Sequence, residues 1–145
     1  MYDKEKVLAI GSDHAGFKLK EFLKKKLIEK GYMVNDFGTD SEKSVDYPDI
    51  IHPLALSIEK GEIEKGIVIC GSGNGAQMVA NKHKNVRAAL CWNSEQATLS
   101  RMHNDANIIS LPARFIKNDV ALDAVKLFLN TGFEGGRHKQ RVEKI

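Results

Sequence analysis

Short apolar runs alternate with amphipathic segments along the whole of this 145-residue chain. Five runs predict strands, at residues 7–10, 32–38, 66–70, 87–92 and 107–112. Such runs, bounded by turn-forming residues, are typical of strands buried in a sheet. The longer segments between them carry apolar residues at helical spacing. Because the two kinds of segment alternate without a repeat or a long linker, we expect one α/β domain over residues 1–145. Its five-stranded parallel sheet would have helices on both faces.

The segments between the runs carry helix start and stop signals. Helices are expected at residues 17–31, 47–61, from about 74, 94–103 and 119–132, with a short one in the tail 134–145. Asn93 and Gln96 resemble a capping box, and Asn118 is expected to cap the helix that follows it. Pro53 falls in the first turns of the second helix, where we expect it to bend or delay that helix.

The carboxyl ends of the predicted strands are the expected place for a ligand, because parallel sheets bind ligands at that edge. With the strand order 2-1-3-4-5, the first and third strands are neighbours. Residues 11–14 and 70–75, far apart in the sequence, would then face each other across one crevice.

Composition excludes several classes of protein. The formal net charge of +3 is too small to argue for a nucleic-acid partner, although it suits a small anionic ligand. No run approaches the roughly 20 apolar residues of a membrane span, and the N-terminus lacks the apolar stretch of a signal peptide. Cys70 and Cys91 form no CxxC or zinc-ligand spacing. We therefore expect a reducing, cytoplasmic setting, with neither a disulfide nor a metal site.

Cys70 ends the third apolar run and opens onto the glycine-rich loop CGSGNG, residues 70–75. Its thiol is either a small core residue beside a turn or a reactive group, such as a nucleophile, a redox thiol or a base. The glycines permit close approach of a ligand, and amides at the next helix start can bind an anion or a developing oxyanion. The loop lacks the Gly-Lys-Ser/Thr of a Walker A motif. Ala76 and Gln77 stand where a phosphatase-type cysteine loop ends in arginine.

Two further stretches carry polar groups that suit chemistry. Asp13 and His14 follow the first predicted strand and can bind a polyol and a phosphate, although Asp13 can equally cap a helix. His103 can act as an acid or a base near neutral pH, and it can equally be an ordinary loop residue. Asn104 and Asp105 can bind hydroxyl groups or simply close a turn.

The tail contains the basic stretch GGRHKQR, residues 135–141. Arg137 and Arg141 are four residues apart, so on a helix they share one face. Two guanidinium groups on one face suit a phosphate through bidentate contacts. A solvated basic tail, which is common at chain ends, is the alternative interpretation.

Six motifs occur in order over nearly the whole chain. They are GSDHAGF at 11–17, VDYPD at 45–49, GIVICGSGNG at 66–75, ANK at 80–82, SRMHNDANI at 100–108 and GGRHKQRV at 135–142. In combination they resemble the ribose-5-phosphate isomerase B family, which also includes galactose-6-phosphate isomerase subunits. The resemblance implies a Rossmann-like fold and interconversion of ribose 5-phosphate and ribulose 5-phosphate without a metal or other cofactor. It also implies a homodimer, or a dimer of dimers, with active sites shared between subunits.

The resemblance implies roles for residues of these motifs. Cys70 corresponds to the general base that moves a proton between C2 and C1, and Ser72 lies near the developing enediolate oxygen. The anion-binding and substrate-binding loop comprises Gly71, Ser72, Gly73, Asn74 and Gly75. His103 corresponds to the residue that opens the furanose ring, and Asp13 to an acid that binds a hydroxyl group and assists ring opening.

A phosphate-binding set and further substrate contacts are implied as well. The phosphate set comprises His14, Arg137 and Arg141, and the further contacts comprise Tyr47, Asn104 and Arg114. Two other functions stay open at this point. One is an isomerase for a hexose 6-phosphate, such as allose or galactose 6-phosphate. The other is a non-catalytic module that binds a sugar phosphate or a nucleotide.

Ala76 bears on the identity of the base. One version of the family has a cysteine base before a CGTG-like loop, and the other has a glutamate base in GSGNGE and no cysteine. This chain has the GSGNG loop with Ala76 in the place of the glutamate. Since alanine cannot take a proton and a thiolate can, we assign the base to Cys70.

Overall fold

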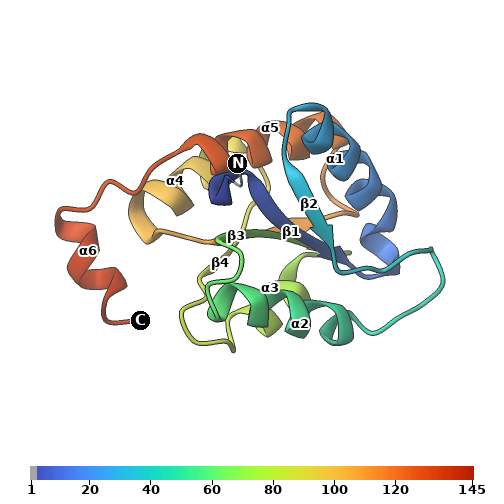
Figure 1. Cartoon of the computed structure of the whole chain (residues 1–145), viewed down its shortest axis with the longest axis horizontal. Coiled ribbons are helices and arrows are strands. Elements are labelled where there is room, and N and C mark those ends of the chain that lie inside the picture. Colours follow the sequence, from blue (N-terminus) through green and yellow to red (C-terminus); the bar gives the residue numbers. More distant parts are fainter. Residues whose placement is uncertain (1–2) are drawn as a thin grey trace.

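The computed structural model describes residues 3–145 and shows a central sheet between two layers of helices (Figure 1). The strands are β1 (Val7–Ser12), β2 (Met33–Asp36), β3 (Lys65–Cys70), β4 (Ala88–Leu90) and β5 (Ile108–Pro112). All paired strands run parallel, in the order β2-β1-β3-β5-β4. The predicted α/β class with a five-stranded parallel sheet is confirmed.

The positions of the last two strands differ from the expected order 2-1-3-4-5. β5 lies beside β3, and β4 is the edge strand. All five residues of β5 are buried, whereas β4 has three residues, two of them partly exposed. The apolar β5 therefore takes the interior place, because burial on both faces removes more of its apolar surface from water. β1 and β3 are neighbours, as the expected site requires.

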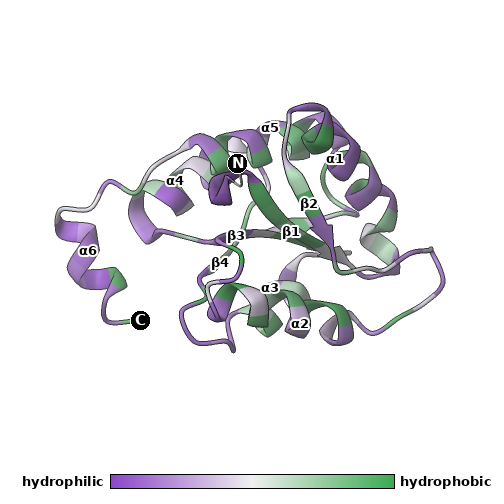
Figure 2. Ribbon diagram, viewed as in Figure 1, coloured by the Kyte–Doolittle hydropathy of each residue, from purple (hydrophilic) through white to green (hydrophobic). Residues whose placement is uncertain are grey.

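Two hydrophobic cores cover the two faces of the sheet. Helices α1 (Phe17–Glu29), α4 (Ser94–Asn104) and α5 (Asn118–Asn130) pack on one face, and α2 (Tyr47–Glu59) and α3 (Asn74–Ala80) pack on the other. Successive strand residues alternate between them: Leu8 and Ile10 join the first core, and Val7 and Ala9 join the second. Figure 2 shows the hydrophobic colour of β1 between these helices. Helices on both faces are thereby confirmed.

The helix boundaries confirm one predicted cap and correct another. The amide of Gln96 donates to Oδ1 of Asn93 (2.9 Å), so Asn93 caps α4 as expected; the amide of Trp92, rather than that of Asn93, donates to Oε1 of Gln96, so the reciprocal half of the capping box is shifted by one residue. Asn118 is not a cap, because it is already the first residue of α5. The N-cap is Lys117, whose side chain makes no capping hydrogen bond.

Three short elements complete the fold. They are the 3₁₀ turns Lys4–Lys6 and His14–Gly16 and the helix α6 (Arg137–Val142). α6 stands apart from the layered body, beyond the end of α4, and is mostly hydrophilic (Figures 1 and 2). Pro53 lies inside α2, which begins before it, so this proline does not delay the helix. Among residues 3–145, no helix is long and apolar enough to cross a membrane.

Candidate active site

Cys70 stands at the carboxyl end of β3, where the neighbouring strand β5 holds the backbone. The amide of Ala113 donates to the carbonyl of Cys70 (2.9 Å), and the amide of Arg114 donates to the carbonyl of Gly71 (3.0 Å). The Cys70 residue is 4% exposed and belongs to the core beneath α2 and α3. Cys70 is thus both a packed core residue and the first residue of the loop at the ligand-binding edge.

Gly73 gives this loop its shape. Its φ of +76° is left-handed, and a Cβ atom there would lie 3.1 Å from the carbonyl carbon of Leu111, so only glycine fits well. The hydroxyl of Ser110 donates to the Gly73 carbonyl (2.7 Å). Within residues 3–145, the amides of Ser72 and Gly73 donate to no protein acceptor. The amide of Asn74, in contrast, already donates to Oγ of Ser72 (3.2 Å) and is not free for a ligand.

Asp13 follows β1 and lies beside the end of β3. Ser12 pairs with Ile69, and the amide of Asp13 donates to the Ile69 carbonyl (3.2 Å). Oδ1 of Asp13 accepts a hydrogen bond from the amide of Gly16 (3.2 Å), so the carboxylate caps the His14–Gly16 turn. Its Oδ2 accepts no hydrogen bond from the residues that the structure describes. The expected capping role and a ligand contact are therefore compatible.

Two side chains from other elements lie against the glycine loop. A Cβ atom on Gly75 would lie 2.8 Å from the hydroxyl oxygen of Tyr47, which begins α2. A Cβ atom on Gly71 would lie 3.0 Å from Nη1 of Arg114. The absence of side chains at these glycines lets a phenol and a guanidinium approach the loop backbone.

His14 joins the same edge of the sheet. Its Nδ1 accepts a hydrogen bond from the amide of Val45 (3.2 Å), which places the proton of the neutral ring on Nε2. The hydrogen bond ties the segment before α2 to the end of β1, and Nε2 remains as a donor. The residues brought together here form the loop group: Asp13, His14, Tyr47, Cys70, Gly71, Ser72, Gly73, Asn74, Gly75 and Arg114.

His103 lies near the amino-terminal ends of the strands, opposite the loop group. β5 begins at Ile108, beside Gly66, and ends at Pro112, beside Cys70. His103 is in the last turn of α4, shortly before β5 begins. Because a strand rises by about 3.3 Å per residue, the length of β5 alone separates the two edges by roughly 13 Å. One chain therefore does not bring His103 and Cys70 together.

The remaining predicted site residues lie on the same side of the sheet as His103. The helix-end group comprises His103, Asn104, Arg137 and Arg141. With His138, three of them line a hollow of about 440 Å³ between α4 and α6. Arg137 and Arg141 both lie on α6, so the expected helical spacing is confirmed. The candidate site is consequently split into two halves within one chain.

His138 is a residue of this second half that the sequence analysis missed. Its ring stacks on that of His103, with centroids 4.3 Å apart and planes 15° apart. Oε2 of Glu134 lies 3.9 Å from Nε2 of His103. The position of His138 between the two arginines of GGRHKQR was the available signal, whereas no spacing rule pointed to Glu134.

Cys91, the second cysteine, lies in a different environment from Cys70. It is fully buried in the core beneath α1, α4 and α5, as expected for a core residue. Burial raises its pKa to about 11. This thiol stays protonated at neutral pH and is out of reach of a substrate. Both cysteines are free thiols.

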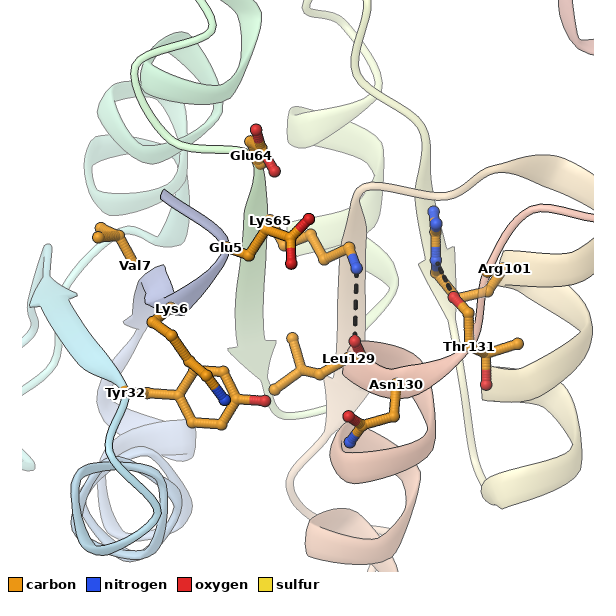
Figure 3. A pocket seen from close by; sticks show the side chains of 11 residues that line it. Glu5, Lys6, Val7, Tyr32, Glu64, Lys65, Arg101, Leu129, Asn130 and Thr131 are labelled. Atoms are coloured by element: carbon orange, nitrogen blue, oxygen red, sulfur yellow. Dashed lines mark hydrogen bonds between the residues drawn. The ribbon is translucent and has the colours of Figure 1, made fainter. Parts of the chain in front are cut away.

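A hollow of about 340 Å³ at the amino-terminal edge of the sheet is separate from both halves (Figure 3). Its cationic groups already have partners: Nζ of Lys65 donates to the Leu129 carbonyl (3.5 Å), and Nε of Arg101 donates to the Thr131 carbonyl (3.0 Å). Burial lowers the pKa of Lys65. No predicted site residue lines this hollow, so we assign it no part in the site.

Fold and site together define an α/β protein with a thiol and unpaired loop amides at the carboxyl ends of its strands. A family model described as Ribose/Galactose Isomerase matches residues 8–145. Ribose-5-phosphate isomerase B of Escherichia coli (strain K12) is 42% identical over 140 residues, which are 97% of this chain and 94% of the relative. The chain belongs to the ribose/galactose isomerase family, which confirms the resemblance seen in the motifs.

Solved structures agree with this membership. Ribose-5-phosphate isomerase B of Clostridium thermocellum superposes with a TM-score of 0.94 and 48% identity, covering 95% of this chain and 93% of that one. The Mycoplasma genitalium enzyme, solved with bound ribulose-5-phosphate, has a TM-score of 0.91 and 38% identity, covering 95% and 92%.

Proposed function

We propose that this chain interconverts ribose 5-phosphate and ribulose 5-phosphate, as an aldose–ketose isomerase that needs no metal. The observation that carries the proposal is the placement of Cys70 in one loop with the amides of Ser72 and Gly73, which donate to no acceptor among residues 3–145. Relatives named ribose-5-phosphate isomerase B, and one neighbour with bound ribulose-5-phosphate, support the substrate.

The reaction follows from the acidity of the C2 proton of the open-chain aldose. The Cys70 thiolate takes this proton, and the electron pair of the C–H bond forms a C1=C2 double bond as the carbonyl oxygen becomes an enediolate oxygen. Cys70 returns the proton to C1, and the hydroxyl proton on O2 moves to O1. Amide donors aimed at the enediolate contribute roughly 3 kcal/mol each, by analogy with oxyanion holes.

We infer that a second copy of the chain supplies the helix-end group to each loop group. The two groups lie at opposite edges of one sheet, and α6 projects from the body with its arginines exposed. Large apolar side chains are also exposed on the single chain: Met78 is 66% exposed, Phe115 60% and Ile145 82%. The stacked rings of Trp92 and Phe115 form an exposed apolar patch, and such patches favour contact with another chain. A homodimer, or a dimer of dimers, of one-domain chains satisfies both observations.

In the shared site, each group has a task that suits its chemistry. The His103 imidazole can exchange a proton with the sugar and so open the furanose ring, with Asp13 holding a hydroxyl group. Arg137 and Arg141 can hold the phosphate through bidentate contacts, together with His14. A phosphate fixed at the chain end positions C2 over the Cys70 thiolate.

The test is the isomerisation of ribose 5-phosphate by wild-type protein, Cys70→Ala and the matched control Cys91→Ala. We expect Cys70→Ala to bind substrate and lose turnover by orders of magnitude, whereas Cys91→Ala keeps turnover. The wild type should keep its activity after treatment with a chelator. Turnover that survives Cys70→Ala would remove Cys70 from the role of base.

Two comparisons separate this proposal from its alternatives. The ratio kcat/KM is measured on ribose 5-phosphate, allose 6-phosphate and galactose 6-phosphate, and a clear preference for a hexose would assign the site to that sugar. A non-catalytic binding module would bind these sugar phosphates equally well in wild type and Cys70→Ala and convert none of them.

A further inference from the structure

His103, Glu134 and His138 bring two imidazoles and a carboxylate together at the end of α4. One ligand atom from each residue lies within 4.8 Å of the other two. The amide of Glu134 donates to the carbonyl of Met102 (3.1 Å), which fixes the segment before α6 against the last turn of α4. The cluster therefore joins two elements that are far apart in the sequence, and its position is set by the backbone.

Nε2 of His138 lacks the partner that its burial demands. The residue is 6% exposed, and this nitrogen makes no hydrogen bond to any residue from 3 to 145. Buried polar atoms are nearly always bonded to something. The His138 ring offers one of its nitrogens to the cluster with His103 and Glu134, so a ligand held there can supply an interaction that this side chain lacks.

The charges around the cluster affect its affinity for a cation. Glu134 brings one carboxylate, whereas Arg137 and Arg141 lie on the same short helix as His138. The two arginines also repel a cation, so we expect weaker binding than in a dedicated structural metal site.

Closing the cluster around an ion requires the side chains to rotate. Bonds of about 2.0–2.1 Å to Zn²⁺ place tetrahedral ligand atoms about 3.4 Å apart, so atoms that lie up to 4.8 Å apart must approach by up to about 1.4 Å. The stacked rings must turn about their Cβ–Cγ bonds, a torsion with a broad minimum for histidine. Within the described part of the chain, the side chains of His103 and Glu134 make no hydrogen bond that this rotation would break.

We propose that His103, Glu134 and His138 form a site for a late first-row divalent ion such as Zn²⁺, which binds His103 reversibly. Two imidazoles with one carboxylate favour Zn²⁺, Co²⁺, Ni²⁺ or Cu²⁺ over Mg²⁺ and Ca²⁺, which prefer oxygen ligands. Binding blocks the imidazole that opens the sugar ring, so the ion is an inhibitor and not a cofactor. This consequence rests on the proposed function, whereas the ion binding does not.

Titration of the full-length protein with Co²⁺ tests the site directly, because Co²⁺ held by nitrogen and oxygen ligands shows visible absorption. We expect one ion per chain, displaced by Zn²⁺. His138→Gln and Glu134→Gln should each weaken binding at least tenfold. His52→Gln is the matched control, since His52 pairs with His83 at 2.7 Å in a separate surface cluster, and it should bind Co²⁺ like the wild type. Circular dichroism checks that each variant is folded.

Several outcomes would overturn the proposal. They are the absence of cobalt absorption, wild-type affinity in both folded ligand variants, or loss of binding in His52→Gln. A sulfur-to-cobalt charge-transfer band would place the ion on a cysteine instead. In an activity assay, Zn²⁺ should inhibit the wild type more than Glu134→Gln, each relative to its own metal-free rate. Cobalt binding without isomerase activity would refute the proposed function and leave the site standing.

Discussion

The ring of Tyr47 packs so closely on Gly75 that a methyl group on this glycine would lie 2.8 Å from the phenol oxygen. Tyr47 begins α2 and Gly75 lies in the first turn of α3, so the contact joins both helices at the glycine-rich loop. Gly75→Ala should displace the ring. Because Tyr47 is a proposed substrate contact, we expect KM for ribose 5-phosphate to rise about tenfold, a loss of about 1.4 kcal/mol of binding. Steady-state kinetics measure this change.

Gly132→Ala is the control for that substitution. A Cβ atom at Gly132 meets nothing within 4 Å, so this variant should keep the KM of the wild type. An unchanged KM in Gly75→Ala would show that the Tyr47 contact does not matter to substrate binding.

Sites shared between two copies predict complementation between inactive variants. Cys70→Ala and His103→Ala should each be inactive, because every site of either homodimer lacks one group. In a mixed dimer one of the two sites is intact, so random exchange of equal amounts should restore about a quarter of wild-type activity. The assay follows activity after the chains are mixed and allowed to exchange.

A second mixture serves as the control for complementation. Cys70→Ala and Asp13→Ala both alter the loop group, so their mixed dimers contain no intact site and should stay inactive. If Cys70→Ala and His103→Ala also fail to complement after demonstrated exchange, the two groups do not form a shared site.

Asp36 forms an ion pair with the almost fully buried ammonium of Lys20. Loss of the Asp36 carboxylate should therefore destabilise the fold in a pH-dependent way. Nζ of Lys20 lies 2.6 Å from Oδ2 of Asp36, and Nζ of Lys24 lies 2.8 Å from it. Burial acts to raise the pKa of Asp36, but hydrogen bonds from the two lysines and the Gly38 amide outweigh it and lower the pKa. The carboxylate therefore stabilises the fold above its ordinary pKa of 3.8, and this contribution disappears as the pH falls through the lower folded-state pKa.

We expect Asp36→Asn to lower the free energy of unfolding at pH 7 by about 2 kcal/mol, because the Lys20 ammonium then keeps only its contact with Glu21. Chemical denaturation at pH 7 and at pH 3 measures the difference, which should shrink at the lower pH. Glu42→Gln removes an exposed pair with Lys18 and should have almost no effect. Equal effects of both substitutions would contradict the role of the buried lysine.

Cys91 should make the fold sensitive to alkaline pH. Its pKa in the folded protein is about 11, against an ordinary value of 9.0, so the unfolded chain loses the thiol proton first as the pH rises. The contribution to stability is complete below about pH 9 and falls between about pH 9 and 11, by at most about 2 kcal/mol. Unfolding curves of wild type and Cys91→Ala over this range should converge with rising pH. Parallel curves would show that Cys91 does not titrate in this way.

Local patterns predicted the elements because each strand and cap depends on residues close in the sequence. The apolar run at 66–70 became β3, and Asn93 caps α4 by accepting from the amide of Gln96. The prediction that Asn118 caps α5 was wrong because the helix already begins at Asn118, one residue earlier than a cap at that position requires. The order of the last two strands depended on the relative burial of β4 and β5, which no local pattern states.

The sequence by itself determined the kinds of residue available for chemistry and the adjacency of the first and third strands. Cys70, the glycine loop and Asp13 follow strand ends, and parallel strands put those ends at one edge of the sheet. The order of elements already places His103 at the other edge, whereas only the tertiary structure decided that α6 lines a hollow beside it with Arg141. A helix that returns between parallel strands must end where the next strand begins, so the end of α4 lies at the amino-terminal edge, away from Cys70.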